Sequence, residues 1–338
     1  MSTARIRAIA SCLPERVVTN EELAERLQLA DPDEIFRNTG IRERRAVAEG
    51  ECASDLATRA ARKLLDSGAV RPEDVEFVLF CSQTPDYYLP TTACLIQDRL
   101  GLPKTVGASD IAQGCSGYVM GLAFMKGLIE SGQIRGGLLL TGDSITRFAN
   151  PRDRSVATLF GDAGTATFLS SDGPGGLLGV TVFGSDGKGG PSLMIPAGGS
   201  RLPRSAETGV EHADASGSIR SQNDLYMDGK EIFRFSISVV PKAFQALLDK
   251  AGWSSDDVDQ IVLHQANGFM LEQLAKRLKA GRDRVPFCFE RTGNTTSSTI
   301  PIVLEQLAAE DKLTSGARVA MLGFGVGLSW AGCTAVWS

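Results

Sequence analysis

The chain contains one repeated segment, and this repeat limits its fold more than any other feature. Residues 64–81 align without gaps to residues 247–264. Each copy reads as the end of a helix, an acidic turn and a short apolar strand. Two unrelated strand–helix units can resemble each other by chance, but here the lengths of all three elements also agree. We therefore expect two halves with the same local plan.

Strand-like and helix-like runs alternate along most of the chain. Strand-like runs lie at 5–10, 75–81, 106–112, 136–141, 165–169 and 178–183, and helix-like runs lie at 92–100, 118–129 and 229–251. The continuous apolar character of 75–81 is typical of a strand buried on both faces. This alternation predicts an α/β fold with a largely buried sheet, divided into halves 1–172 and 173–338. Pro241 either kinks the helix at 229–251 or starts a second helix.

Composition argues against several classes of protein. The net charge of −5 over 338 residues does not suit a general nucleic-acid binder. The first residues lack the apolar core of a signal peptide, and no apolar run reaches the length of a membrane span. The seven cysteines are scattered and there are only two histidines, so neither a disulfide framework nor a metal site is indicated. We expect a cytoplasmic protein without a bound metal.

Cys115 is the first candidate for chemistry. It lies between the strand-like run at 106–112 and the helix-like run that begins at Tyr118. Free backbone N–H groups and the dipole at a helix N-terminus stabilise a thiolate, which makes such a cysteine a candidate nucleophile. A small residue buried under a Gly-rich turn is the alternative interpretation.

The repeat supplies two partners for this cysteine. When the alignment of the two copies is continued with a shift of four residues, Asn294 aligns with Cys115. Each of these residues precedes a helix-like run, at 116–130 and at 295–310. His264 follows the apolar strand of the second copy, at the strand end where open α/β sheets bind ligands. If the halves pack about a pseudo-two-fold axis, the three residues converge on one pocket. Taken singly, Asn294 could be a plain helix cap and His264 a structural residue. We expect His212, in a polar loop, to be solvated.

Several motifs together resemble one family. Residues 113–117, 264–267 and 293–295 resemble the Cys-His-Asn set of the type III β-ketoacyl-acyl carrier protein synthases. Residues 39–45, 153–164 and 323–330 resemble three further signatures of these enzymes, in the same order. The resemblance implies a thiolase-like fold, in which two duplicated βα halves form a layered αβαβα structure.

The resemblance also implies a mechanism. Cys115 would accept an acyl group from a thioester of coenzyme A or of a phosphopantetheine carrier. The backbone N–H groups of Cys115 and Val326 would bind the oxyanion, and His264 and Asn294 would assist the decarboxylation of a malonyl-type thioester. No metal or nicotinamide cofactor is implied.

Further residues are assigned substrate contacts or partners by the same resemblance. Arg154 and Asn267 would line the tunnel for the carrier arm, and Leu89 would reach across a homodimer interface into the partner's acyl pocket. Basic residues could dock an acidic acyl carrier protein, although a solvated helix face explains them equally well: Lys276, Arg277, Lys279 and Arg282.

Two departures from the family pattern concern the thioester donor. Housekeeping members carry a tryptophan that stacks on the coenzyme A adenine, and residues 33–38 contain none. Phe269 occupies the position of a usual basic residue. Both changes favour a carrier-protein donor, or a specialised relative in secondary metabolism. Such a relative would join an acyl chain to another acyl chain or to an oxygen or nitrogen nucleophile.

Two remoter alternatives share part of the pattern. A papain-like cysteine protease has the same Cys, His, Asn order, but its local cysteine motif differs from Gly-Cys-Ser-Gly. A thiolase would need a second reactive cysteine in the C-terminal glycine loop, where residues 325–327 have none.

Overall fold

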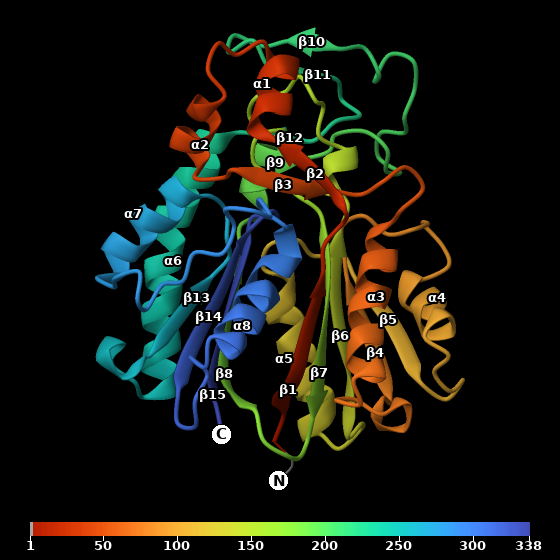
Figure 1. Cartoon of the computed structure of the whole chain (residues 1–338), viewed down its shortest axis with the longest axis vertical. Helices are drawn as coiled ribbons and strands as arrows, with labels where there is room; N and C mark the ends of the chain where they lie inside the picture. The colour runs from red at the N-terminus through yellow and green to blue at the C-terminus, as the bar shows by residue number, and fades with distance from the viewer. Residues whose placement is uncertain (1–2) are drawn as a thin grey trace.

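The strands of the chain form two groups that meet along one short seam. The computed structural model describes residues 3–338. One group is ordered β1 (Arg5–Cys12), β7 (Ala163–Ser170), β6 (Gly136–Asp143), β4 (Phe77–Cys81) and β5 (Gly107–Ile111). The other is β8 (Gly176–Ser185), β15 (Ser329–Val336), β14 (Arg318–Gly325) and β13 (Gln260–Leu263). The groups join only where Arg5 and Ile6 of β1 pair with Leu177 and Gly176 of β8, so the sheet divides into two blades (Figure 1).

Helices cover both outer faces and fill the space between the blades. Helices α3 (Ala53–Asp66) and α4 (Thr92–Arg99) pack on the first group of strands. Helix α6 (Gly229–Ala251) packs on the second group, and α7 (Gly268–Leu278) packs on α6. Between the blades, α5 (Gly117–Glu130) and α8 (Thr299–Ala309) each contact strands of both groups (Figure 1). The predicted α/β class and its layered arrangement are confirmed.

The repeated segment folds the same way twice. Residues 64–81 form the end of α3, the short helix η1 (Pro72–Asp74) and β4. Residues 247–264 form the end of α6, the short helix η4 (Ser255–Asp257) and β13, with His264 directly after the strand. Helix α6 continues through Pro241 without ending, so this proline does not start a second helix. The predicted boundary at 172/173 falls in the turn between β7 and β8.

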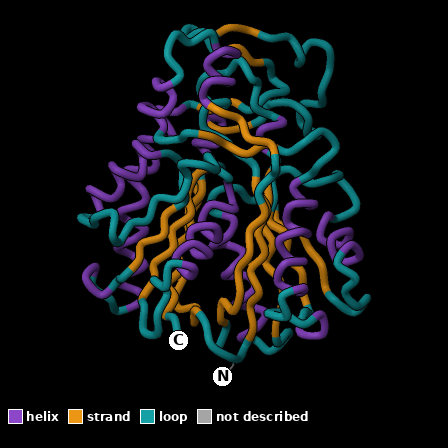
Figure 2. Tube along the Cα trace, in the orientation of Figure 1, coloured by secondary structure: helices purple, strands orange, loops and turns teal. Residues whose placement is uncertain are grey.

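The remaining elements gather at the end of the molecule opposite the two termini (Figure 1). They include β2 (Arg16–Thr19), α1 (Asn20–Leu27), α2 (Asp33–Thr39) and β3 (Glu43–Ala46). The Gly- and Ser-rich segment contributes η3 (Gly187–Ser192) and short strands joined by long loops (Figure 2): β9 (Leu193–Met194), β10 (His212–Ala213), β11 (Ile219–Arg220) and β12 (Tyr226–Met227). No helix within residues 3–338 is both long and apolar enough to cross a membrane.

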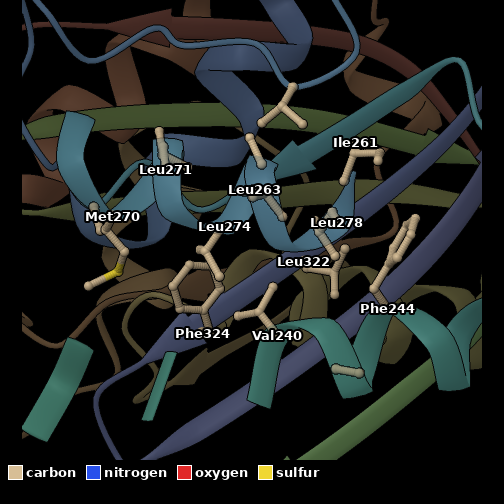
Figure 3. Packing of buried hydrophobic residues seen from close by; sticks show 14 of the residues in the cluster. Val240, Phe244, Ile261, Leu263, Met270, Leu271, Leu274, Leu278, Leu322 and Phe324 are labelled. Atoms are coloured by element: carbon tan, nitrogen blue, oxygen red, sulfur yellow. The ribbon is translucent and has the colours of Figure 1, made fainter. Parts of the chain in front are cut away.

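A buried cluster fixes the second blade against its helices. Figure 3 shows Val240 and Phe244 of α6 facing side chains from β13, β14 and α7. Leu263, the last residue of β13, and Leu322, its partner in β14, are both at most 2% exposed. Burial of a large apolar side chain contributes roughly 1.5–3 kcal/mol, so this packing holds the strand ends firmly. The residues that follow them, His264 and the Gly323–Gly325 run, are therefore placed by a rigid core.

Candidate functional site

Cys115 lies in the turn between β5 and α5, deep between the two blades. Its residue is 5% exposed. The glycines around it have no room for a side chain. A Cβ atom at Gly325 would lie 2.7 Å from the Cys115 sulfur, and one at Gly323 would lie 2.6 Å from the Cys115 carbonyl oxygen. The C-terminal glycine loop is therefore packed directly on the cysteine turn.

His264 follows β13 and is 2% exposed. Its backbone N–H donates to the carbonyl of Leu322, at 2.9 Å, which continues the pairing of β13 with β14. The ring nitrogen Nδ1 lies 2.8 Å from Oγ1 of Thr299. The edge of the ring meets Phe324, with the ring centroids 5.5 Å apart. These contacts fix the imidazole plane through Nδ1 and leave Nε2 as the nitrogen available for chemistry.

The backbone of Asn294 pairs with residues 159–161. Its N–H donates to the carbonyl of Leu159 at 2.9 Å, and its carbonyl accepts from Gly161 at 3.1 Å. Its side-chain Oδ1 accepts from the N–H of Thr296 at 3.0 Å. The sequence predicted a helix directly after Asn294. Instead, a short helix η5 (Thr296–Ser298) comes first, because Thr296 adopts a left-handed φ of 51°.

Two cavities meet at Cys115. The larger, about 300 Å³, is lined by Cys115, His264 and Asn294 together, and by Asn267 and Phe324. The smaller, about 130 Å³, has a mainly apolar wall that includes Ile145, Phe160, Leu193, Leu225 and Val326. The structure thus brings the three predicted catalytic side chains to one cavity and places an apolar chamber beside the sulfur.

Burial determines the protonation of these groups. It raises the pKa of the Cys115 thiol to about 12, although hydrogen bonding from the backbone of Val326 and of Cys115 itself opposes this shift. A helix start favours ionisation of a thiol, but here the loss of hydration outweighs the backbone donors and opposes ionisation of Cys115. Burial also lowers the pKa of His264 to about 3, so its imidazole is neutral at physiological pH.

Of the residues predicted to contact substrate, some line the cavity around Cys115 and others lie on the surface. Asn267 lines the larger cavity and caps α7, where its Oδ1 accepts from the N–H of Met270 at 2.9 Å. Arg154 donates to the carbonyl of Leu27 at 3.0 Å. Phe269 is 55% exposed and stacks on Phe233, and Leu89 is 81% exposed in the loop before α4. Asn267 therefore lines the same cavity as Cys115, His264 and Asn294, whereas Leu89 and Phe269 lie on the surface of the single chain.

Phe269 borders a surface hollow of about 380 Å³. Phe36, Arg37, Arg282 and Phe287 share this hollow. It lies where the sequence lacks the expected tryptophan, and two arginines stack here on aromatic rings: Arg42 on Phe36 and Arg282 on Phe287. Among residues 3–338, no group of three His, Cys, Asp or Glu side chains is arranged to hold a metal ion. His212 is exposed, as predicted.

Sequence reasoning missed the polar residues behind the site. Asp143 ends β6 and is 0% exposed, and it accepts hydrogen bonds from Thr296 and Ser297 of η5. An acidic residue two positions after the strand-like run at 136–141 was the available signal. The run of hydroxyl residues at 295–299 was a second one.

Two segments of the chain match family models. Residues 109–187 match the model described as 3-oxoacyl-[acyl-carrier-protein] synthase III, and residues 248–337 match its C-terminal model. A β-ketoacyl-[acyl-carrier-protein] synthase III from Caldanaerobacter subterraneus is 35% identical over 99% of this chain and 98% of that protein.

Solved structures show the same similarity in three dimensions. A crystal structure of a 3-oxoacyl-(acyl-carrier-protein) synthase III covers 99% of this chain and all of that chain, with 48% identity and a TM-score of 0.96. A 3-oxoacyl-(acyl-carrier protein) synthase from Burkholderia xenovorans covers 99% of this chain and 94% of that chain, with 37% identity and a TM-score of 0.90. The predicted thiolase-like arrangement is confirmed by these matches.

Proposed function

Because this chain belongs to the family of type III β-ketoacyl-acyl carrier protein synthases and is a condensing acyltransferase, we propose that Cys115 carries the acyl group and that His264 and Asn294 assist the condensation. The observation that carries this proposal is the shared cavity, which Cys115, His264 and Asn294 all line. The protease and thiolase alternatives are not favoured by the relatives.

The first half-reaction transfers an acyl group to the sulfur. The Cys115 sulfur attacks the carbonyl carbon of an acyl thioester, so a new carbon–sulfur bond forms and the bond to the carrier sulfur breaks. The thiol proton passes to the departing carrier thiolate. Because the Cys115 pKa is about 12, this proton leaves during the attack rather than before it. We assign the tetrahedral oxyanion to the backbone N–H groups of Cys115 and Val326, since Val326 lines the cavity that Cys115 also lines.

The second half-reaction forms the new carbon–carbon bond. A malonyl-type thioester loses carbon dioxide, and the electron pair of the broken bond forms an enolate. His264 and Asn294 donate hydrogen bonds to the enolate oxygen. The enolate carbon attacks the acyl carbonyl, the Cys115 sulfur leaves, and it takes up a proton from water. Both donors are neutral, since asparagine does not titrate and burial holds His264 uncharged. As neutral donors, they stabilise the negative charge that develops on the enolate oxygen. A cation would instead pair with the substrate carboxylate before it is lost.

The role of His264 as a donor depends on its tautomer. Thr299 Oγ1 lies 2.8 Å from Nδ1 and 3.0 Å from the carbonyl oxygen of Thr296. Its single hydroxyl hydrogen can go to either acceptor. When it goes to Nδ1, the ring hydrogen sits on Nε2, and Nε2 becomes the donor that the enolate requires.

The acceptor in this proposal is a malonyl thioester of an acyl carrier protein. Lys276 and Arg277 are exposed near the C-terminal end of α7, and Asn267, which caps the other end of this helix, lines the larger cavity. A phosphopantetheine arm could then enter that cavity while the carrier rests on α7. Arg282 lines the hollow that contains Phe269, where it pairs with Glu272 at 2.7 Å.

We also propose that the chain acts as a homodimer. Strand β5 is the last strand of its blade, so its outer edge is unpaired in the single chain. The adjoining loop exposes three large apolar side chains, Tyr87, Tyr88 and Leu89, at 60%, 88% and 81%. A second copy would cover this surface and bring Leu89 toward its partner's acyl chamber.

Intact mass spectrometry tests the proposal. The protein is mixed with a panel of acyl-coenzyme A and acyl-carrier thioesters, with Cys115→Ala as the matched variant. We expect a mass gain of one acyl group, located on Cys115 by peptide mapping and absent from the variant. If no thioester loads the protein, or if the acyl group lies on Cys94, the exposed cysteine, the proposal fails.

A further inference from the structure

The carboxylate of Asp143 is buried between the halves of the chain. It ends β6, is 0% exposed, and pairs with no Lys, Arg or His among residues 3–338. Its Oδ1 accepts from the N–H of Gln83 at 2.7 Å, and its Oδ2 accepts from the hydroxyls of Ser297, at 2.8 Å, and Thr296. Burial raises the pKa of this carboxyl, and the hydrogen bonds from Thr296, Gln83 and Ser297 oppose that shift. A buried carboxylate without a counter-ion is costly, so a role beyond stability is to be sought in the groups that it holds.

Thr296 connects this carboxylate to both neutral donors of the site. Its hydroxyl donates to Asp143, and its N–H donates to Asn294 Oδ1 at 3.0 Å. Its carbonyl oxygen lies 3.0 Å from Thr299 Oγ1, the atom that contacts His264 Nδ1. A φ of 51° is uncommon for a β-branched residue. The two hydroxyl bonds from Thr296 and Ser297 to Asp143 hold the backbone in this conformation.

We propose that Asp143 is a positioning residue that acts through Thr296 to orient the Asn294 amide and the His264 ring for condensation. This inference rests on the roles proposed above for Asn294 and His264. Asn294 lines the larger cavity, and with its Oδ1 occupied by the Thr296 N–H, its Nδ2 group remains as the part of the amide that can donate to a substrate there. With the Thr296 carbonyl fixed, Thr299 stays within reach of His264 Nδ1.

The same carboxylate has an opposite effect on the nucleophile. The charge of Asp143 contributes to raising the pKa of the Cys115 thiol, after the larger effect of burial. The other titratable groups nearby, Cys81 and His264, are neutral, since burial raises the pKa of Cys81 and lowers that of His264. Removal of the Asp143 charge should therefore favour ionisation of Cys115 while it disturbs the two donors.

The Asp143→Asn variant tests this combination, because it keeps the side-chain shape and removes the charge. We expect malonyl-thioester decarboxylation to fall on the order of tenfold or more. We expect alkylation of Cys115 by iodoacetamide at pH 7, followed at the Cys115 peptide, to become about threefold faster. Unchanged decarboxylation would overturn the inference. A parallel loss of both rates would also overturn it, because it would indicate a purely structural role.

Two variants of Thr296 keep the test decisive if Asp143→Asn does not fold. Thr296→Val removes the hydroxyl and keeps the Asp143 charge, so decarboxylation should fall while Cys115 alkylation does not rise. Thr296→Ser keeps the hydroxyl and should retain decarboxylation, and equal rates for Val and Ser would refute the inference. If His264→Ala and Asn294→Ala decarboxylate normally, the proposed function itself fails. If they do not but Asp143→Asn does, only this inference fails.

Discussion

Gly325 of β14 lies so close to Cys115 that a Cβ atom at this glycine would be 2.7 Å from the sulfur. The two residues are 210 positions apart in the chain and come from different halves. Such a separation is shorter than any ordinary contact between a carbon and a sulfur atom. The position of the nucleophile is therefore set by a residue without a side chain.

This contact predicts that Gly325→Ala displaces the Cys115 sulfur from its attack position. A shift of about 1 Å can reduce a reaction rate about a hundredfold, so we expect acyl loading, measured by intact mass, to slow by at least that factor. Gly187→Ala is the matched control, since a Cβ at Gly187 meets nothing within 4 Å. Normal loading of Gly325→Ala would show that the turn can relax.

Variants of His264 and Asn294 should lose the second half-reaction and keep the first. His264→Ala and Asn294→Ala should still load an acyl group on Cys115, because neither side chain is assigned to the first oxyanion. Each should lose about 10²-fold or more in malonyl decarboxylation, as expected for removal of one preorganised donor. Release of labelled carbon dioxide measures this step. His212→Ala, in the exposed hairpin, serves as a control, and an equal loss in both half-reactions would contradict the assignment.

Because His264 is buried and neutral, the free energy of unfolding should fall at mildly acidic pH. Its folded pKa is about 3, whereas a histidine in the unfolded chain titrates near 6.5. Below pH 6.5 the unfolded chain therefore binds a proton that the folded chain does not, and stability falls as the pH falls. From pH 7 to pH 5 this single group should cost about 2 kcal/mol. Denaturant unfolding at pH 7 and pH 5 gives the loss of unfolding free energy for wild type and for His264→Gln. The difference between the two losses is the contribution of His264.

Other buried acids do not disturb this comparison. Burial raises the pKa of Asp162 to about 6, so Asp162 contributes stability that grows as the pH falls, which opposes the effect of His264. Both proteins contain Asp162, and its contribution cancels in the difference. An equal loss of stability in wild type and variant would show that His264 is protonated in the folded chain near neutral pH.

The exposed apolar loop predicts the oligomeric state. Multi-angle light scattering should give a mass of twice 35.9 kDa for the wild type. Tyr88→Asp combined with Leu89→Asp should shift the protein toward the mass of one chain, because charges would be buried at the interface. Val210→Asp changes another half-exposed apolar residue, outside the loop, and should leave the dimer intact. A wild-type mass of one chain would refute the dimer.

The basic end of α7 predicts a difference between carriers. Lys276→Glu combined with Arg277→Glu should raise KM for a malonyl-acyl carrier protein about tenfold, with little change in kcat, since rim charges act mainly on encounter. KM for malonyl-coenzyme A should change little. Lys312→Glu, beyond the end of α8, is the control. Equal effects on both substrates would place the carrier protein elsewhere.

The sequence was sufficient for much of this site because its signals are local or repeated. The repeat of 64–81 in 247–264 placed His264 after a buried strand, and its continued register paired Cys115 with Asn294. Each of these inferences depends on periodicity and on residues close together in the chain. The structure keeps them, with α5 and α8 both between the blades, where their buried side chains belong to one hydrophobic cluster.

The sequence did not predict the short helix η5 after Asn294. Local propensity favoured one continuous helix from Thr295, but Thr296 takes a left-handed φ because Asp143, 153 residues away, accepts its hydroxyl. Such a contact has no signature in the neighbouring residues. Tertiary hydrogen bonding therefore overrode the local preference.

By itself, the sequence determined the α/β plan, the duplicated halves and the Cys115, His264 and Asn294 set. Only the tertiary structure decided the state of that set. A helix start predicts a stabilised thiolate, but Cys115 is enclosed by Gly323, Gly325 and the blades, and burial raises its pKa to about 12. The free energy of removing a charge from water depends on every atom around it, and only folding places those atoms.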